Sequence, residues 1–101
     1  MTLSPLSFNR ARWDAAYNQV LDGSHTRERM ADALVASKQL VGMSRAEVFA
    51  LLGEPPATDK WPEYDLVYWL GPTHPFPIDS EWLVMRLSVS GKVTEADRIA
   101  D

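Results

Sequence analysis

The apolar residues near the start of the chain recur at the three- and four-residue spacing of an amphipathic helix. The stripe consists of Trp13, Ala16, Tyr17, Val20 and Leu21. This pattern predicts a first helix over 7–21, and Gly23 follows it as a plausible stop. Trp13 is expected to pack in the core from this helix.

A second helical stripe predicts a helix that is capped by Ser24 or Thr26 and runs to about Lys38. Its inner face consists of Met30, Ala33, Leu34 and Ser37. Arg27 and Arg29 fall in its first turn, where the helix dipole slightly disfavours cations. The sequence alone therefore does not decide whether Ser24 or Thr26 caps this helix.

The stretch "VGMSRAEVFALLGEPP" predicts a short helix with both ends defined. Ser44 followed three residues later by Glu47 is the pattern of a capping box. Met43 and Val48 are placed as the hydrophobic staple that accompanies such a box. Gly53 is expected to end the helix in the left-handed conformation, and the two prolines that follow it prevent continuation. We therefore expect a helix from Ser44 to about Leu52, with Ser44 as its cap.

After a proline-rich connection, the spacing of the apolar residues changes from that of a helix to that of a strand. Residues 65–71 are rich in strand-forming types, and residues 81–89 alternate strictly. Leu83, Met85, Leu87 and Val89 share one face of the second segment, and Trp82, Val84, Arg86 and Ser88 share the other. The proline-rich loop 71–80 between them cannot form a regular strand. Residues 93–100 predict a weaker last strand whose apolar period of three indicates a bulge or a helical alternative.

The order of these elements predicts one α+β domain over 1–101. Helices occupy residues 1–39, and a short helix followed by three antiparallel strands occupies residues 40–101. The expected architecture has two layers, with the helices packed on one face of a β-meander.

Composition narrows the classes of function. The chain has 101 residues, no cysteine, a net charge of -4 and a pI near 5.0. An acidic protein without a basic patch is unlike a nucleic-acid binder. The two histidines, His25 and His74, lack a second ligand at a regular spacing, so we expect neither a metal nor another cofactor. No apolar run approaches the roughly 20 residues of a membrane span.

One constellation could support catalysis. Asp79 and Glu81 lie near His74 in the loop before the second strand, and a carboxylate–histidine pair can perform general acid–base chemistry. Such proximity in a loop is common among solvated residues, and we therefore do not expect an enzyme. The same loop could instead belong to a small-molecule or peptide site.

The four tryptophans point to a binding surface. A hairpin register with Leu70 opposite Glu81 places Trp69 opposite Trp82 and Val67 opposite Val84. The predicted partner-binding residues on the outer face of the sheet are Val67, Trp69, Trp82, Val84 and Arg86, with Trp61 as a further anchor. An exposed apolar patch of this kind indicates a protein partner or self-association. The alternative is that the N-terminal segment or the proline loop covers the patch.

The motifs of residues 40–93 resemble the SmpA/OmlA family, the small BamE-like lipoproteins of bacterial outer-membrane assembly. The resemblance consists of Gly42-Met43-Ser44, Leu52-Gly53-Glu54-Pro55, Tyr68-Trp69 and Gly91-Lys92-Val93. It implies a fold of the β-lactamase-inhibitor-protein type and a bacterial protein-interaction module without enzymatic activity. Members carry a leader and a lipidated cysteine, whereas this sequence looks closer to uncharacterised relatives. It is expected in the cytoplasm if Met1 is the native start, and otherwise as a periplasmic lipoprotein that associates with the membrane.

Overall fold

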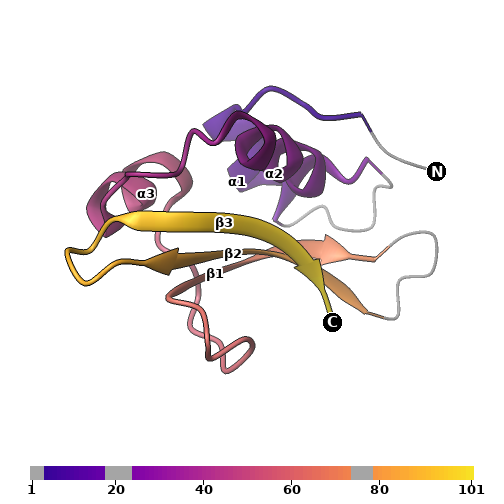
Figure 1. Cartoon of the computed structure of the whole chain (residues 1–101). Coiled ribbons are helices and arrows are strands. Elements are labelled where there is room, and N and C mark those ends of the chain that lie inside the picture. The colour runs from indigo at the N-terminus through magenta and orange to yellow at the C-terminus, as the bar shows by residue number, and fades with distance from the viewer. Residues whose placement is uncertain (1–3, 18–23, 74–78) are drawn as a thin grey trace.

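The computed structural model describes residues 4–17, 24–73 and 79–101. The helices within these ranges are α1 (Arg10–Ala16), α2 (Thr26–Ser37) and α3 (Arg45–Leu52). The strands are β1 (Leu66–Pro72), β2 (Ser80–Leu87) and β3 (Val93–Ala100). The strands form an antiparallel sheet in the order β1-β2-β3, and α1 and α2 lie over one of its faces (Figure 1). The α+β two-layer architecture expected from the sequence is thus confirmed.

The first two helices begin differently from the sequence-based expectation. α1 begins at Arg10 rather than at Ser7 because the side chain of Asn9 accepts a hydrogen bond from Arg12 N at 3.0 Å and caps the helix. The predicted end of this helix lies outside the described residues. The residue before α2 is His25 in the left-handed conformation, so neither Ser24 nor Thr26 acts as its cap.

The N-terminus of α3 agrees with the sequence-based prediction. Ser44 Oγ accepts a hydrogen bond from Glu47 N at 3.1 Å, and Glu47 Oε1 accepts one from Ser44 N at 2.9 Å. These bonds complete the capping box and satisfy two of the free backbone donors of the first turn. They also lower the pKa of Glu47, chiefly through the backbone N–H of Ser44.

The helix α3 ends by a different mechanism from the one expected. Gly53 has φ 86° and ψ 164°, which is not the left-handed helical conformation but a region that side-chain-bearing residues rarely adopt. Side chains from α1 and β1 donate to the free carbonyl groups of the last turn. The bonds run from Arg10 Nη1 to Ala50 O (3.1 Å), from Trp13 Nε1 to Leu52 O (3.0 Å) and from Tyr68 Oη to Gly53 O (2.6 Å). These bonds tie α3 to α1 and to the edge strand β1.

The strand register is close to the predicted one. Trp69 pairs with Trp82 and Val67 pairs with Val84, as expected. Glu81 pairs with Gly71 rather than with Leu70, because the register shifts by one residue after Trp69. A second irregularity, between β2 and β3, places Val93 and Ala96 on the same face of the sheet, whereas Ile99 pairs with Trp82 and lies on the other face. The last segment is a strand and not the helical alternative.

The core lies between the helices and the inner face of the sheet. Its buried members are Trp13, Met30, Ala31, Leu34, Leu40, Val48, Leu52, Leu66, Tyr68, Leu70, Leu83, Met85 and Val93. The placement of Trp13 from α1 and of Leu83 and Met85 from β2 agrees with the sequence, whereas Val89, expected on the same face, lies beyond the end of β2 and is fully exposed. Within the described residues, no helix has the length and apolar character needed to cross a bilayer.

Candidate functional site

The outer face of the sheet is covered in its middle by the connection between α3 and β1. This connection, residues 53–65, crosses the face that points away from α1 and α2 (Figure 1). Val84 is 0% exposed and Trp82 is 9% exposed, although both project to this side. The expectation of a fully open apolar face is therefore wrong for these two residues. The connection on this side is neither the N-terminal segment nor the proline loop 71–80 that the sequence offered as a cover, and residues 74–78 of that loop lie outside the described residues.

Side-chain contacts of Tyr64 and Lys60 hold the connection against the sheet. The guanidinium carbon of Arg86 lies 4.4 Å from the ring centroid of Tyr64, a cation–π contact. Lys60 Nζ lies 2.7 Å from Asp101 Oδ2, and Asp101 Oδ1 accepts the indole N–H of Trp82 at 3.1 Å. The hydrogen bonds from Lys60, from Trp82 and from the backbone N–H of Ser80 lower the pKa of Asp101. Asp101 therefore stays ionised over the whole physiological range.

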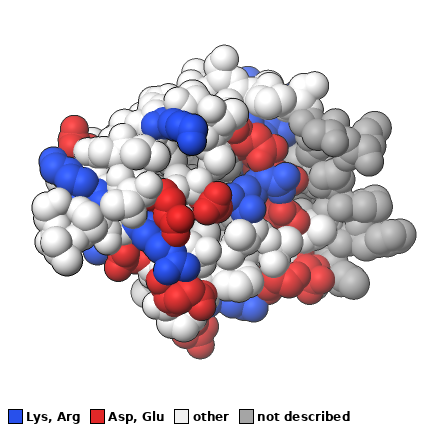
Figure 2. All heavy atoms as spheres, viewed as in Figure 1, with Lys and Arg blue, Asp and Glu red and all other residues white. Residues whose placement is uncertain are grey.

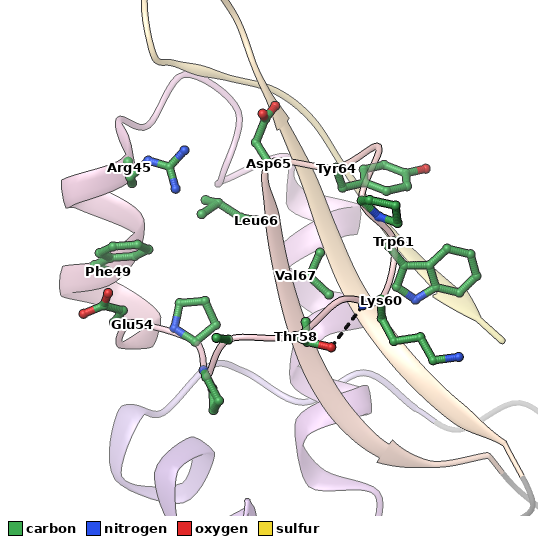
Figure 3. A pocket seen from close by; sticks show the side chains of 14 residues that line it. Arg45, Phe49, Glu54, Thr58, Lys60, Trp61, Tyr64, Asp65, Leu66 and Val67 are labelled. Atoms are coloured by element: carbon green, nitrogen blue, oxygen red, sulfur yellow. Dashed lines mark hydrogen bonds between the residues drawn. The ribbon is translucent and has the colours of Figure 1, made fainter.

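A first cavity of about 370 Å³ opens between α3, the connection and β1. Figure 3 shows Phe49 and Arg45 on the α3 side, Trp61 and Tyr64 on the opposite side, and Leu66 and Val67 of β1 between them. Prolines of the connection contribute the rest of its apolar wall. Arg45, Glu54, Lys60 and Asp65 supply charges of both signs to the lining. An apolar hollow with a few polar groups is the usual form of a ligand or peptide site.

Trp61, one of the predicted anchors, lines this cavity in an unusual conformation. Its φ is 54°, which costs energy for a residue with a side chain. Its indole N–H is buried and has no hydrogen-bond partner among the described residues. Strained residues and unsatisfied polar groups are concentrated at functional sites, so both features favour a role for this loop.

A second cavity, of about 390 Å³, lies on the other side of the connection. Its lining consists of Val67, Trp69 and Trp82 from the outer sheet face, Pro56, Ala57 and Thr58 from the connection, and Tyr17. Tyr17 contacts Trp69 edge to face, with ring centroids 5.7 Å apart. Trp69 and Val67 are half-buried, so part of each side chain is accessible. With the half-buried Trp61 and the exposed Arg86, these two residues are the accessible part of the predicted patch.

The six predicted contact residues are therefore distributed unequally. Trp61, Val67, Trp69 and Trp82 line one or both cavities, whereas Val84 is fully enclosed. Arg86 is partly exposed and is engaged by Tyr64 and by Glu95, whose carboxylate lies 2.6 Å from its Nε. Sequence reasoning missed the contributions of Tyr17, Phe49 and Tyr64, of which the first two come from helical segments earlier in the chain. The paired prolines after α3 were the available signal for this site.

The alternative catalytic constellation is not assembled in the described residues. His74 lies outside them, and Asp79 is exposed. Glu81 is buried and accepts hydrogen bonds from Arg98 Nη1 at 2.6 Å and from Thr73 Oγ1 at 2.8 Å. Arg98 also pairs with Glu28 and Asp32 of α2, so this carboxylate belongs to an ion network that links α2 to the sheet.

Among the described residues there is no group of three or more histidine and carboxylate side chains arranged to hold a metal ion. Acidic and basic side chains are interspersed on the face seen in Figure 2, which shows no extended basic patch among the residues that it describes.

The fold and these cavities define a small α+β domain with an apolar, loop-bounded cleft on the outer face of its sheet. No protein-family model matches the sequence, and neither the curated proteins nor the solved structures contain a match to it.

Proposed function

We propose that this protein is a non-enzymatic binding module that holds an apolar segment of another protein, or of a second copy of itself, against the outer face of its sheet. The observation that carries the proposal is the cavity of about 390 Å³ between Trp69, Trp82 and the proline-rich connection. Aromatic side chains that remain partly accessible in an apolar hollow are typical anchors of protein interfaces. The motif resemblance to SmpA/OmlA proteins supports the same class of function.

The residues expected to contact the partner are those whose side chains are partly accessible in the two cavities. Trp69 and Val67 present their accessible parts to the second cavity, and Trp61 does so to the first. Val84 is 0% exposed and is therefore not expected to contact the partner directly. The partner segment thus lies along the connection and does not replace it.

Peptides selected from a random display library against the wild-type protein test the proposal. Their dissociation constants are then measured for the wild type, for Trp69→Ser and for Val41→Ser, whose side chain is 48% exposed and lines none of the cavities described above. We expect Trp69→Ser to weaken binding at least about ten-fold, as truncation of an aromatic anchor does at protein interfaces, and Val41→Ser to leave it unchanged. Equal losses in both variants, or a library without specific binders, would refute the proposed surface.

Self-association is tested separately by sedimentation equilibrium. If a second copy is the partner, the wild type should form dimers at high concentration and Trp69→Ser should shift the equilibrium toward monomer. If both the wild type and Trp69→Ser are monomers, self-association is refuted and the partner is a different protein.

A further inference from the structure

Arg27, in the first turn of α2, is an arginine enclosed by aromatic rings. Its residue surface is 7% exposed. The guanidinium carbon lies 3.9 Å from the ring centroid of Trp13 and 5.1 Å from that of Tyr17. Its Nη1 donates a hydrogen bond of 2.6 Å to the backbone carbonyl of Trp69 on β1. These contacts fix the guanidinium at the free edge of β1, between the helices and the sheet.

The charge of Arg27 has no partner of opposite sign in the described part of the chain. None of the ion pairs found there includes Arg27, and its buried Nε has no hydrogen-bond partner. Asp14 attracts it at longer range, but both carboxylate oxygens of Asp14 accept bonds from Arg10 Nε, at 3.0 and 2.9 Å. Burial lowers the pKa of Arg27 to about 10, so the group is still charged at neutral pH.

Burying a charge without a counter-ion is costly, and the aromatic rings compensate for only part of that cost. An unpaired buried charge that lines a cavity is therefore a candidate for recognition of a ligand of opposite sign. Arg27 lines a third cavity, of about 310 Å³, together with Tyr17, Tyr68, Trp69 and the segment that follows α3.

This third cavity adjoins the apolar cavity on the outer face. Tyr17, Pro56 and Trp69 line both of them. A ligand that spans the two cavities would place an anionic group at Arg27 and an apolar group against Trp69 and Trp82. The third cavity is also lined by Arg10, Asp14 and Glu54, so the charges of its four charged side chains sum to zero at neutral pH. That balance favours a singly charged carboxylate over a phosphate.

We propose that Arg27 binds the C-terminal carboxylate of a peptide chain whose last side chains occupy the apolar cavity. A guanidinium matches the planar carboxylate geometrically, and hydrogen bonds between charged groups are the stronger kind. Two adjoining cavities accommodate more than one residue, which favours a chain end over a small organic acid. This proposal rests on the proposed function and names the class of partner: a protein with an accessible apolar C-terminus.

The test uses acetyl-Leu-Phe with a free carboxylate, the same dipeptide as its C-terminal amide, and phenylacetate. Dissociation constants are measured by NMR titration at neutral pH for the wild type, Arg27→Gln, Arg27→Lys and the control Arg12→Gln. Arg12 is exposed on α1 and lines none of the cavities described here. In the wild type and in Arg12→Gln, we expect the free acid to bind at least ten-fold more tightly than the amide. In Arg27→Gln the acid should bind no better than the amide, with Arg27→Lys intermediate.

Several results would overturn the assignment. Equal affinity of acid and amide in the wild type would refute it even if Arg27→Gln failed to fold. Phenylacetate binding as tightly as the dipeptide acid would refute a chain end as the ligand. If the affinity of the library peptides depended on Trp69 but did not change when their C-terminus was amidated, the role of Arg27 would be refuted and the proposed function would stand. If binding of the free acid depended on Arg27 but not on Trp69, the outer face of the sheet would not be the binding surface, and the proposed function would be wrong.

Discussion

Val84→Ala distinguishes a covered outer face from an open one. Val84 projects away from the helices yet is 0% exposed, and we attribute this burial to the connection between α3 and β1, which lies on that side of the sheet. The substitution removes two methyl groups, and each buried methylene-sized group contributes about 0.8 kcal/mol, so the transfer cost is about 1.6 kcal/mol. A residual cavity adds to this cost, and we expect a total loss of about 1.5–2.5 kcal/mol in the free energy of unfolding.

Urea denaturation of the wild type, Val84→Ala and the control Val89→Ala provides the measurement. Val89 is fully exposed just after β2, and its truncation should change stability by less than about 0.5 kcal/mol. Strand preference alone accounts for at most about 1 kcal/mol at position 84. A loss below that value, matched by the control, would show that the connection does not cover the sheet.

Three further results follow from the helix ends. Ser44→Ala should lower the free energy of unfolding by about 1 kcal/mol in chemical denaturation, and a change near zero would rule out the capping box. Gly53→Ala should cost about 1–3 kcal/mol because φ is 86° there, and an unchanged melting temperature would contradict that geometry. Because the folded-state pKa of Glu47 lies below its ordinary value of 4.5, its contribution is complete at higher pH and is lost as pH falls through the folded-state pKa. Glu47→Gln should weaken this acid dependence, and an identical pH profile of stability would show that the carboxylate is not involved.

The local signals in the sequence predicted those elements whose causes are local. The boundaries of α3 follow from Ser44, Glu47 and Gly53, all within one short stretch, and the core face of β2 follows from strict alternation. The conformation of Gly53 could not be predicted, since it depends on Arg10, Trp13 and Tyr68 donating to the last turn from elsewhere in the chain.

The candidate site was predicted incompletely for the same reason. Alternation correctly placed Trp69 and Trp82 on the outer face, but it contained no information about which segment lies over that face. The long-range contacts of Lys60 with Asp101 and of Tyr64 with Arg86 determine that coverage. Trp82→Ser, which an open face would tolerate, is now expected to destabilise the fold because its indole is buried and bonded to Asp101.

Arg27 shows most clearly which features could not be predicted from the sequence. In the sequence it is one of two arginines in the first turn of a helix, and nothing distinguishes it from Arg29. In the structure Arg29 bonds to the backbone carbonyl of Ser4, whereas Arg27 is enclosed by Trp13 and Tyr17. The difference arises from the packing of α1 on α2, which no local pattern encodes.

The central claim is that partners bind at the outer-face cleft, and a chemical-shift map of the protein with a selected peptide tests it most directly. We expect the largest changes at the indole N–H groups of Trp61 and Trp69 and at the backbone amide of Val67, which lie around the two outer-face cavities. Residues on the exposed side of α2, such as Ala36, should be unaffected. Shifts confined to the helical layer, with the signals of Trp61, Trp69 and Val67 unchanged under saturating peptide, would contradict the account.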